Sequence, residues 1–183
     1  NPHKWMFTNF DCSVYFVKRA DLLIKTFEIL PEYLKTKSRG LVNDYRDWGV
    51  PLGRRFRALK LWFVIRSMGI EGIRAKLRFH IELNSTFSAE LANTPDIEIP
   101  MKPFLNFTCF RLRPAGLENP EELNKLNERF LEKINAGGKL FLTHTKIQNL
   151  YTLRMIIGQT YVGQEHMELA LKEIRAAAIK VLN

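Results

Sequence analysis

A lysine near the start of the sequence stands among aromatic and apolar residues. Lys4 is followed by Trp5, Met6 and Phe7, and Phe10 lies a few positions further on. Apolar surroundings disfavour the charged form of an ammonium group, so they lower its pKa from about 10.4 and leave a nucleophilic amine. The pattern makes Lys4 a candidate for condensation with a carbonyl compound. The alternative is a solvated surface charge, which is the commoner role of a lysine.

The segment after Lys4 predicts one strand and then a long loop. Asp11–Val17 is a short, apolar, β-rich run, as expected for a buried strand. Residues 18–51 lack a long hydrophobic period and include the polar patch 35–40. A loop of this length in a compact domain is typical of a lid or a binding segment. Tyr33 lies in this segment, where an exposed tyrosine is usually an incidental surface residue.

Two helices are expected next. Across residues 54–68 apolar side chains occur on most sides of the predicted helix, which is typical of a buried helix. Gly69 and Gly72 predict a break, because glycine destabilises a helix interior. A second helix then continues towards Leu91.

The remaining residues mix strands with helices. Strands are predicted at 97–99, 107–112, 140–145 and 151–157. A helix is expected to begin with Asn119 as N-cap and Pro120 as its first residue, and to end at Gly137. A last amphipathic helix is expected over 164–182. Strands with two helices on one side predict a small α+β layer.

Composition narrows the classes of protein. The 183 residues are 46% hydrophobic and 26% charged, as in a globular chain. No apolar run approaches the ~18 residues of a membrane helix, so no membrane association is expected. The histidines and the two cysteines, Cys12 and Cys109, show no metal-ligand spacing, and isolated cysteines favour a reducing compartment such as the cytoplasm.

The net charge of +9 leaves two interpretations open. It is compatible with a non-catalytic basic module that binds nucleic acid or another anion. It is equally compatible with an enzyme of anionic ligands. The densest basic cluster, 54–57, opens an apolar helix and forms no separate tail, so we expect no nucleic-acid partner.

Two blocks of the sequence resemble one enzyme family. NPHKW followed by NFDCSVYFVK is similar to the cofactor-lysine segment of the group II pyridoxal-phosphate-dependent decarboxylases, which act on aromatic amino acids, tyrosine, tryptophan or histidine. DYRDWGVPLGRRFRALKLWFVIRSMGIEG resembles a second family block in the same order. NLYTLRMIIG is more loosely similar to the family's last strand. The resemblance covers the whole chain but less than half of a family member, so we expect a piece of a longer protein.

The resemblance implies roles for the N-terminal residues. Lys4 would form the internal Schiff base with the aldehyde of pyridoxal 5′-phosphate (PLP). His3 would touch the cofactor phosphate or the substrate, and Asn1 is similar to a residue near the phosphate. Phe10 matches an aromatic residue near the cofactor pocket, with ordinary packing as an equal alternative. The family's acid for the ring nitrogen and its ring-stacking residue lie upstream of Lys4.

The resemblance also implies roles further along the chain. Leu52 and Gly53 look like the pair that a family homodimer lends to the neighbouring subunit's site. Arg154 matches the family's Leu-Arg pair in the last strands and is assigned no role. For Leu52 and Arg154 packing is an equal alternative.

The segment LPEYLKTKSRG resembles the family's mobile lid, at about residues 30–41. Tyr33 falls on the lid tyrosine, which would return a proton to the carbanion that decarboxylation leaves. A closing lid also excludes water. Relatives with phenylalanine there are aldehyde synthases, so Tyr33 favours simple decarboxylation and the aldehyde synthase is the alternative enzyme.

Together these features imply an α/β chain of the PLP-dependent transferase fold type I. Residues 1–83 would end the large cofactor domain, and 84–183 would form a small C-terminal α+β domain. The expected activity is PLP-dependent decarboxylation of an L-amino acid in a cytoplasmic homodimer with shared active sites. An aromatic substrate is favoured because the chain keeps LGRRFRALKLW, and because Gly53 stands where animal histidine decarboxylases carry serine.

Overall fold

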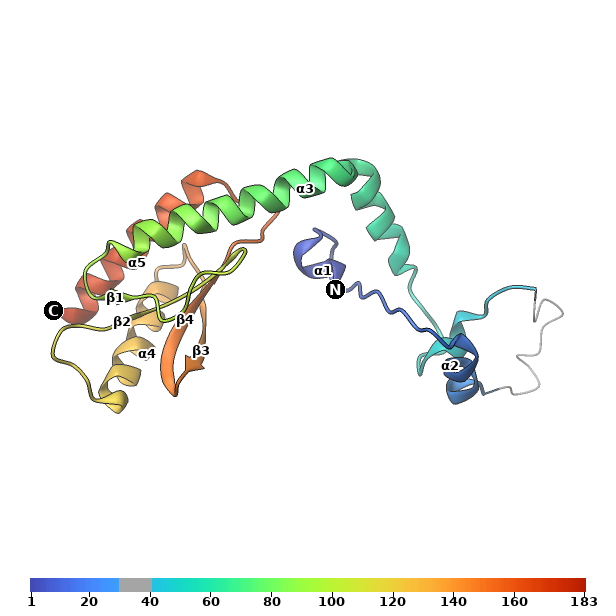
Figure 1. Cartoon of the computed structure of the whole chain (residues 1–183), viewed down its shortest axis with the longest axis horizontal. Helices are drawn as coiled ribbons and strands as arrows, with labels where there is room; N and C mark the ends of the chain where they lie inside the picture. Colours follow the sequence, from blue (N-terminus) through green and yellow to red (C-terminus); the bar gives the residue numbers. More distant parts are fainter. Residues whose placement is uncertain (30–40) are drawn as a thin grey trace. The chain divides into compact units, whose positions relative to one another are not determined.

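A computed structural model describes residues 1–29 and 41–183 (Figure 1). The chain divides into two compact units, Asn1–Gly69 and Ile70–Asn183. Within the described residues, no helix is long and apolar enough to cross a lipid bilayer.

The first unit contains short helices joined by irregular segments. Helix α1 is the single turn Pro2–Trp5, α2 spans Ala20–Phe27, and η2 is the 3-10 helix Tyr45–Trp48. The predicted strand Asp11–Val17 is wrong for this structure, since a strand needs a neighbouring strand for its backbone groups and no described strand lies beside this segment. The expectation of a continuous loop over residues 18–51 is also wrong, because α2 and η2 lie within it.

Helix α3 spans Arg57–Ala92 and is interrupted at Gly69, which has φ 65° and ψ 170°. The predicted break is therefore confirmed, and glycine suits it because other residues are strained at positive φ. The predicted burial of the first part is wrong: Trp62 and Phe63 are 52% and 57% exposed. Helical periodicity indicates apolar faces, but a face is buried only where another element covers it.

The second unit is built on a four-stranded antiparallel sheet in the order β1-β2-β4-β3. Its strands are β1 (Ile97–Glu98), β2 (Phe107–Leu112), β3 (Thr143–Ile147) and β4 (Leu150–Ile156). The strand predicted at 140–145 is observed as β3, which begins three residues later than predicted. The bounds of the other three strands agree with the prediction within about two residues, which is the usual error of a predicted strand boundary. The register pairs Phe110 with Leu153 and Thr143 with Arg154.

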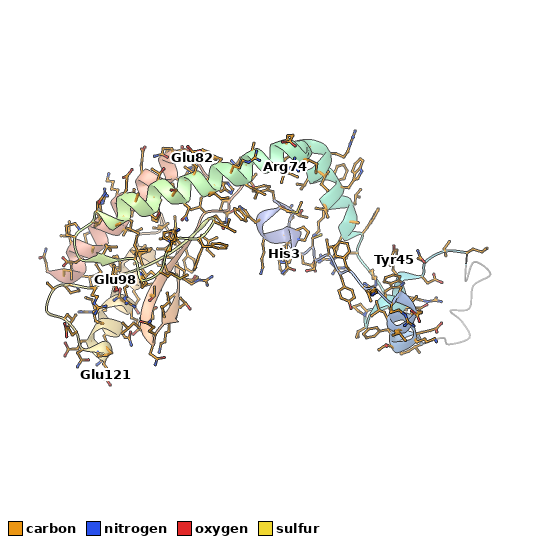
Figure 2. All side chains as sticks on the ribbon, in the orientation of Figure 1. His3, Tyr45, Arg74, Glu82, Glu98 and Glu121 are labelled. Atoms are coloured by element: carbon orange, nitrogen blue, oxygen red, sulfur yellow. The ribbon has the colours of Figure 1, made fainter. Side chains whose placement is uncertain are left out.

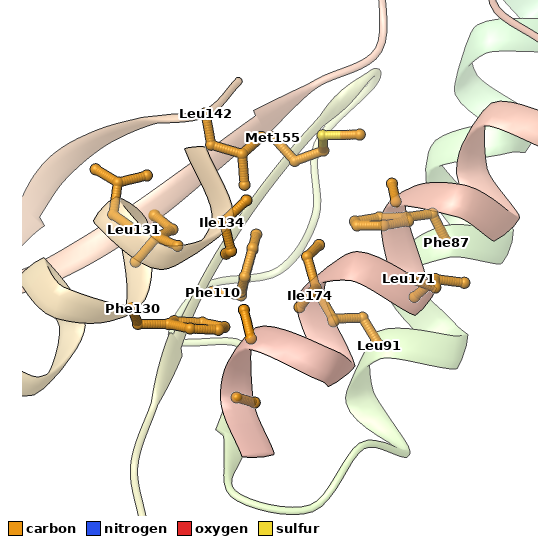
Figure 3. Close-up of a cluster of buried hydrophobic side chains, with 14 of the residues drawn as sticks. Phe87, Leu91, Phe110, Phe130, Leu131, Ile134, Leu142, Met155, Leu171 and Ile174 are labelled. Carbon is orange, nitrogen blue, oxygen red and sulfur yellow. The ribbon is translucent and has the colours of Figure 1, made fainter. Parts of the chain in front are cut away.

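Helices α4 (Pro120–Ala136) and α5 (Gln164–Leu182) cover the sheet together with the later turns of α3. Figure 3 shows Phe110 of β2 between side chains of α4 and α5. The rings of Phe110 and Phe130 meet edge to face, with centroids 6.3 Å apart. Leu91 of α3 and Ile174 of α5 belong to the same buried cluster. The predicted α+β layer is confirmed.

The start of α4 follows the sequence prediction. Asn119 is its N-cap, and the side-chain oxygen accepts hydrogen bonds from the backbone nitrogens of Glu121 and Glu122, at 2.9 and 3.3 Å. These bonds satisfy two of the amide groups that a helix leaves unpaired at its N-terminus.

Candidate functional site

The first turn of the chain positions His3 and Lys4. Pro2 stands at the first helical position of α1, where its missing N–H costs nothing. Successive helical residues project about 100° apart, so the two side chains leave the turn in different directions. Lys4 is exposed, and the prediction that its neighbours bury it is therefore wrong within the described residues. Its amine is open to a carbonyl compound from solvent.

His3 lies in α1 (Figure 2) and contacts the segment that follows the turn. Its Nδ1 lies 3.0 Å from the backbone nitrogen of Cys12 and 2.5 Å from the carbonyl oxygen of the same residue. In the first contact the Cys12 N–H donates to an unprotonated Nδ1. In the second contact a protonated Nδ1 donates to the Cys12 carbonyl oxygen, so the two contacts belong to different tautomers of the ring. The ring also meets Phe10 edge to face, with centroids 5.1 Å apart. Both tautomers tie His3 to Cys12.

Two further hydrogen bonds join the first turn to residues 12–13. The backbone nitrogen of His3 donates to the Cys12 carbonyl over 3.5 Å, and the Ser13 hydroxyl donates to the Asn1 side-chain oxygen over 2.7 Å. Cys12 is buried, and its thiol donates weakly to the Arg57 carbonyl over 3.9 Å. The structure therefore brings Asn1, His3 and Phe10 together with the backbone beside Lys4.

Asp11 links this N-terminal segment to the second family block. Its carboxylate accepts a hydrogen bond from Arg57 Nε at 3.0 Å and is ion-paired with Arg55. Desolvation acts to raise the pKa of Asp11, but the Arg57 hydrogen bond and the charges of Arg55 and Arg57 outweigh it and hold the pKa below its ordinary value. The sequence analysis missed Asp11, because the partners lie more than forty positions away.

Leu52 and Gly53 come just before this arginine cluster. Leu52 is 60% exposed. A Cβ placed on Gly53 would meet no atom within 4 Å, so the position is open in the first unit. Tyr33 and most of the predicted lid lie outside the described residues.

Arg154 lies in the second unit. Its guanidinium sits over the Phe107 ring, 5.5 Å from the centroid, which is cation–π geometry. Arg154 also lines a cavity of about 360 Å³ together with Phe141, Gln159 and His166. No group of three or more His, Cys, Asp and Glu side chains is placed to hold a metal ion in the part of the chain that is described.

Known proteins resemble this chain over its whole length. The family model described as "Pyridoxal-dependent decarboxylase conserved domain" matches residues 1–113. An aromatic-L-amino-acid decarboxylase of Cavia porcellus is 41% identical over 100% of this chain and 37% of its own length. A phenylacetaldehyde synthase of Arabidopsis thaliana is 40% identical over 100% of this chain and 38% of its own length.

Among solved structures, that of Oryza sativa TDC with PLP and tryptamine has a TM-score of 0.91 and 29% identity. It is matched over 100% of this chain and 38% of its own. The likeness confirms the predicted fold class. The chain thus spans about 37% of the length of its curated relatives.

Proposed function

The chain belongs to the pyridoxal-dependent decarboxylase family, and on this premise we propose that the complete protein decarboxylates an L-amino acid to the amine and carbon dioxide. The observation that carries the proposal is the exposed amine of Lys4 on a turn that His3 and Asp11 fasten to both family blocks. A nucleophile needs access and a fixed direction of approach, and the exposure of Lys4 and the contacts that hold its turn support this role.

The residues of the first unit fit PLP chemically. Lys4 offers an amine to the cofactor aldehyde, while His3 and Asn1 offer polar side chains beside it. When bound, PLP supplies an electron sink for the electron pair that the departing carboxylate leaves behind. Phe10 is 82% exposed, and Leu52 and Gly53 are also open, so each is free to line a site completed by the rest of the protein.

Each residue has a distinct proposed task. Lys4 would hold the cofactor through its amine and release it to the amine of the substrate. His3 would orient the cofactor phosphate or the substrate through Nε2, because both contacts with Cys12 use Nδ1. Tyr33 would return a proton to the α-carbon after the carboxylate has left.

An aromatic substrate is the preferred class. Relatives named aromatic-L-amino-acid decarboxylase and tryptophan decarboxylase match the whole chain at about 40% identity, which supports this choice. The absence of a side chain at Gly53 leaves room for a large ring.

We further propose a cytoplasmic homodimer in which each subunit contributes to its neighbour's site. Exposed apolar side chains support association, because surfaces of this kind mark protein interfaces. They are Leu52, Phe56, Trp62 and Phe63. Cys12 and Cys109 are both free and buried, which agrees with a reducing compartment. The proposed domains remain 1–83 and 84–183.

Borohydride trapping of the complete protein tests the function. With excess PLP, reduction should fix one cofactor per subunit on Lys4, located by peptide mass spectrometry. Lys4→Ala should lose this adduct, while Lys18→Ala, at an exposed lysine of the same unit, should keep it. A complete protein that shows no adduct at Lys4 refutes the proposal.

The second candidate function is an aromatic aldehyde synthase, favoured by the Arabidopsis relative of that kind. Such an enzyme releases hydrogen peroxide and ammonia together with the aldehyde. A peroxide assay during turnover separates the two, because simple decarboxylation consumes no oxygen.

A further inference from the structure

The Asp11 side chain joins the two family-like segments of the first unit. One oxygen of its carboxylate meets Arg55, and the other accepts from Arg57 Nε at 3.0 Å. The Cys12 thiol adds a contact to the Arg57 carbonyl. Residues 11–12 thereby attach the start of the chain to the start of α3.

The same two residues also hold the turn that carries Lys4. Cys12 contacts His3 through its backbone nitrogen and oxygen, and His3 directly precedes Lys4. On the other side, Arg55 is two positions after Gly53. A chain of contacts therefore runs from Lys4 through His3, Cys12 and Asp11 to the arginines that follow Gly53.

The ion pairs of Asp11 favour one alignment of residues 11–12 against the start of α3. Two guanidinium groups share one carboxylate, which is a charge-assisted contact with directional geometry. The Asp11 side chain is 31% exposed, whereas that of Arg55 is 68% exposed. Solvent screening therefore makes the pair modest in energy. Its effect is on orientation, because it joins residues more than forty positions apart.

We propose that Asp11 is a positioning residue, which sets the direction of the Lys4 amine within its own subunit through its paired contacts with Arg55 and Arg57. The inference rests on the proposed function, since it concerns the approach of Lys4 to PLP. Asp11 itself touches neither cofactor nor substrate in this assignment.

The test uses the complete protein and measures the rate at which PLP becomes trapped on Lys4. Asp11→Asn removes the negative charge while keeping the size, and we expect trapping to slow about threefold to tenfold. Asp11→Glu restores the carboxylate and should recover at least half of the loss. Asp21→Asn is the matched control, because the ion pair of Asp21 among the described residues is with Arg19, two positions away, at 2.8 Å.

A second measurement separates positioning from general destabilisation. Arg55→Gln changes an exposed side chain, so the fold should tolerate it, and it should slow trapping in the same direction as Asp11→Asn. Both variants should also move the visible absorbance maximum of the bound cofactor, which Asp21→Asn should leave in place. Circular dichroism confirms that each variant is folded.

The outcomes for the two proposals are distinguishable. If the wild-type protein forms no adduct on Lys4, the proposed function itself fails. If the wild type forms the adduct, and Asp11→Asn and Arg55→Gln match Asp21→Asn in rate and absorbance, the positioning role of Asp11 is overturned while the proposed function stands.

Discussion

The side-chain amide of Asn127 in α4 takes the place of a strand beside Leu112 of β2. Its oxygen accepts from the Leu112 nitrogen at 2.7 Å, and its nitrogen donates to the Leu112 oxygen at 2.9 Å. The register of β2 with β4 stops at Phe110 and Leu153, and its continuation would pair Arg111 with Thr152 and then Leu112 with Tyr151. Asn124, one turn earlier in α4, accepts from the Tyr151 nitrogen at 2.6 Å. Two asparagine side chains of α4 thus supply the hydrogen bonds that Leu112 and Tyr151 would otherwise make with each other.

Replacing Asn127 should destabilise the second unit. Asn127→Ala leaves both backbone groups of Leu112 without a partner in a buried place, which costs about 2–4 kcal/mol in the free energy of unfolding. Urea unfolding followed by circular dichroism measures the loss. Asn93→Ala, at an exposed turn position, should stay within about 0.5 kcal/mol of the wild type. Equal stability of the two variants would contradict the role of Asn127.

Phe110 should be among the most sensitive core positions. Its side chain is 0% exposed and packs against Phe130, so Phe110→Ala removes buried surface and leaves a cavity. The expected loss is about 3–5 kcal/mol. Phe141 is 80% exposed, and Phe141→Ala should cost far less in the same thermal-unfolding experiment.

Glu98 should contribute stability that depends on pH. Desolvation acts to raise the pKa of Glu98, but Arg111 Nε at 2.6 Å and Arg113 Nη1 at 3.3 Å outweigh it and lower the pKa. The folded protein therefore binds its proton less readily than the unfolded chain does. The stabilisation is complete above the unfolded value of about 4.3 and is lost as the pH falls through the lowered pKa.

The substitution Glu98→Gln tests this dependence. The variant should have a free energy of unfolding about 1–2 kcal/mol lower than the wild type at pH 7. This difference should shrink as the pH falls below about 4. Thermal unfolding at several pH values measures it. Glu118→Gln, at an exposed position of the same unit, should show a small deficit without this trend. A deficit of Glu98→Gln that is constant with pH would rule out the ion pair as its cause.

Tyr33 should decide the product if the lid assignment is right. In the complete protein, Tyr33→Phe removes the phenolic proton donor, so the carbanion persists and is open to oxygen. We expect amine output to fall at least tenfold and aldehyde with peroxide to rise, while Lys4 still binds PLP. Chromatography of the products and a peroxide assay check both. Tyr45→Phe, an exposed tyrosine in η2, serves as control. Unchanged amine output from Tyr33→Phe would remove Tyr33 from the mechanism.

Local sequence signals predicted the second unit well. Asn119 and Pro120 mark the start of α4 by chemistry that operates within a few residues. The apolar runs of β2 and β4 are buried by the helices of the same unit, so their periodicity and their environment agree. Such elements are predictable because their partners lie within the chain.

The first unit shows where local patterns mislead. Asp11–Val17 has the composition of a strand, and the helix at 54–68 has that of a buried helix, yet neither finds a covering partner among the described residues. Lys4 is exposed for the same reason. An apolar pattern states a preference for burial, and only another element can satisfy it.

The sequence by itself determined the family, through the residues around Lys4 and the block that contains Leu52 and Gly53. It also determined most helix and strand boundaries, which depend on short-range capping and periodicity. Only the tertiary structure decided that Asp11 meets Arg55 and Arg57, and that Asn127 completes the sheet at Leu112. These contacts join residues distant in the sequence, and their formation depends on how the whole backbone folds, which no local pattern encodes.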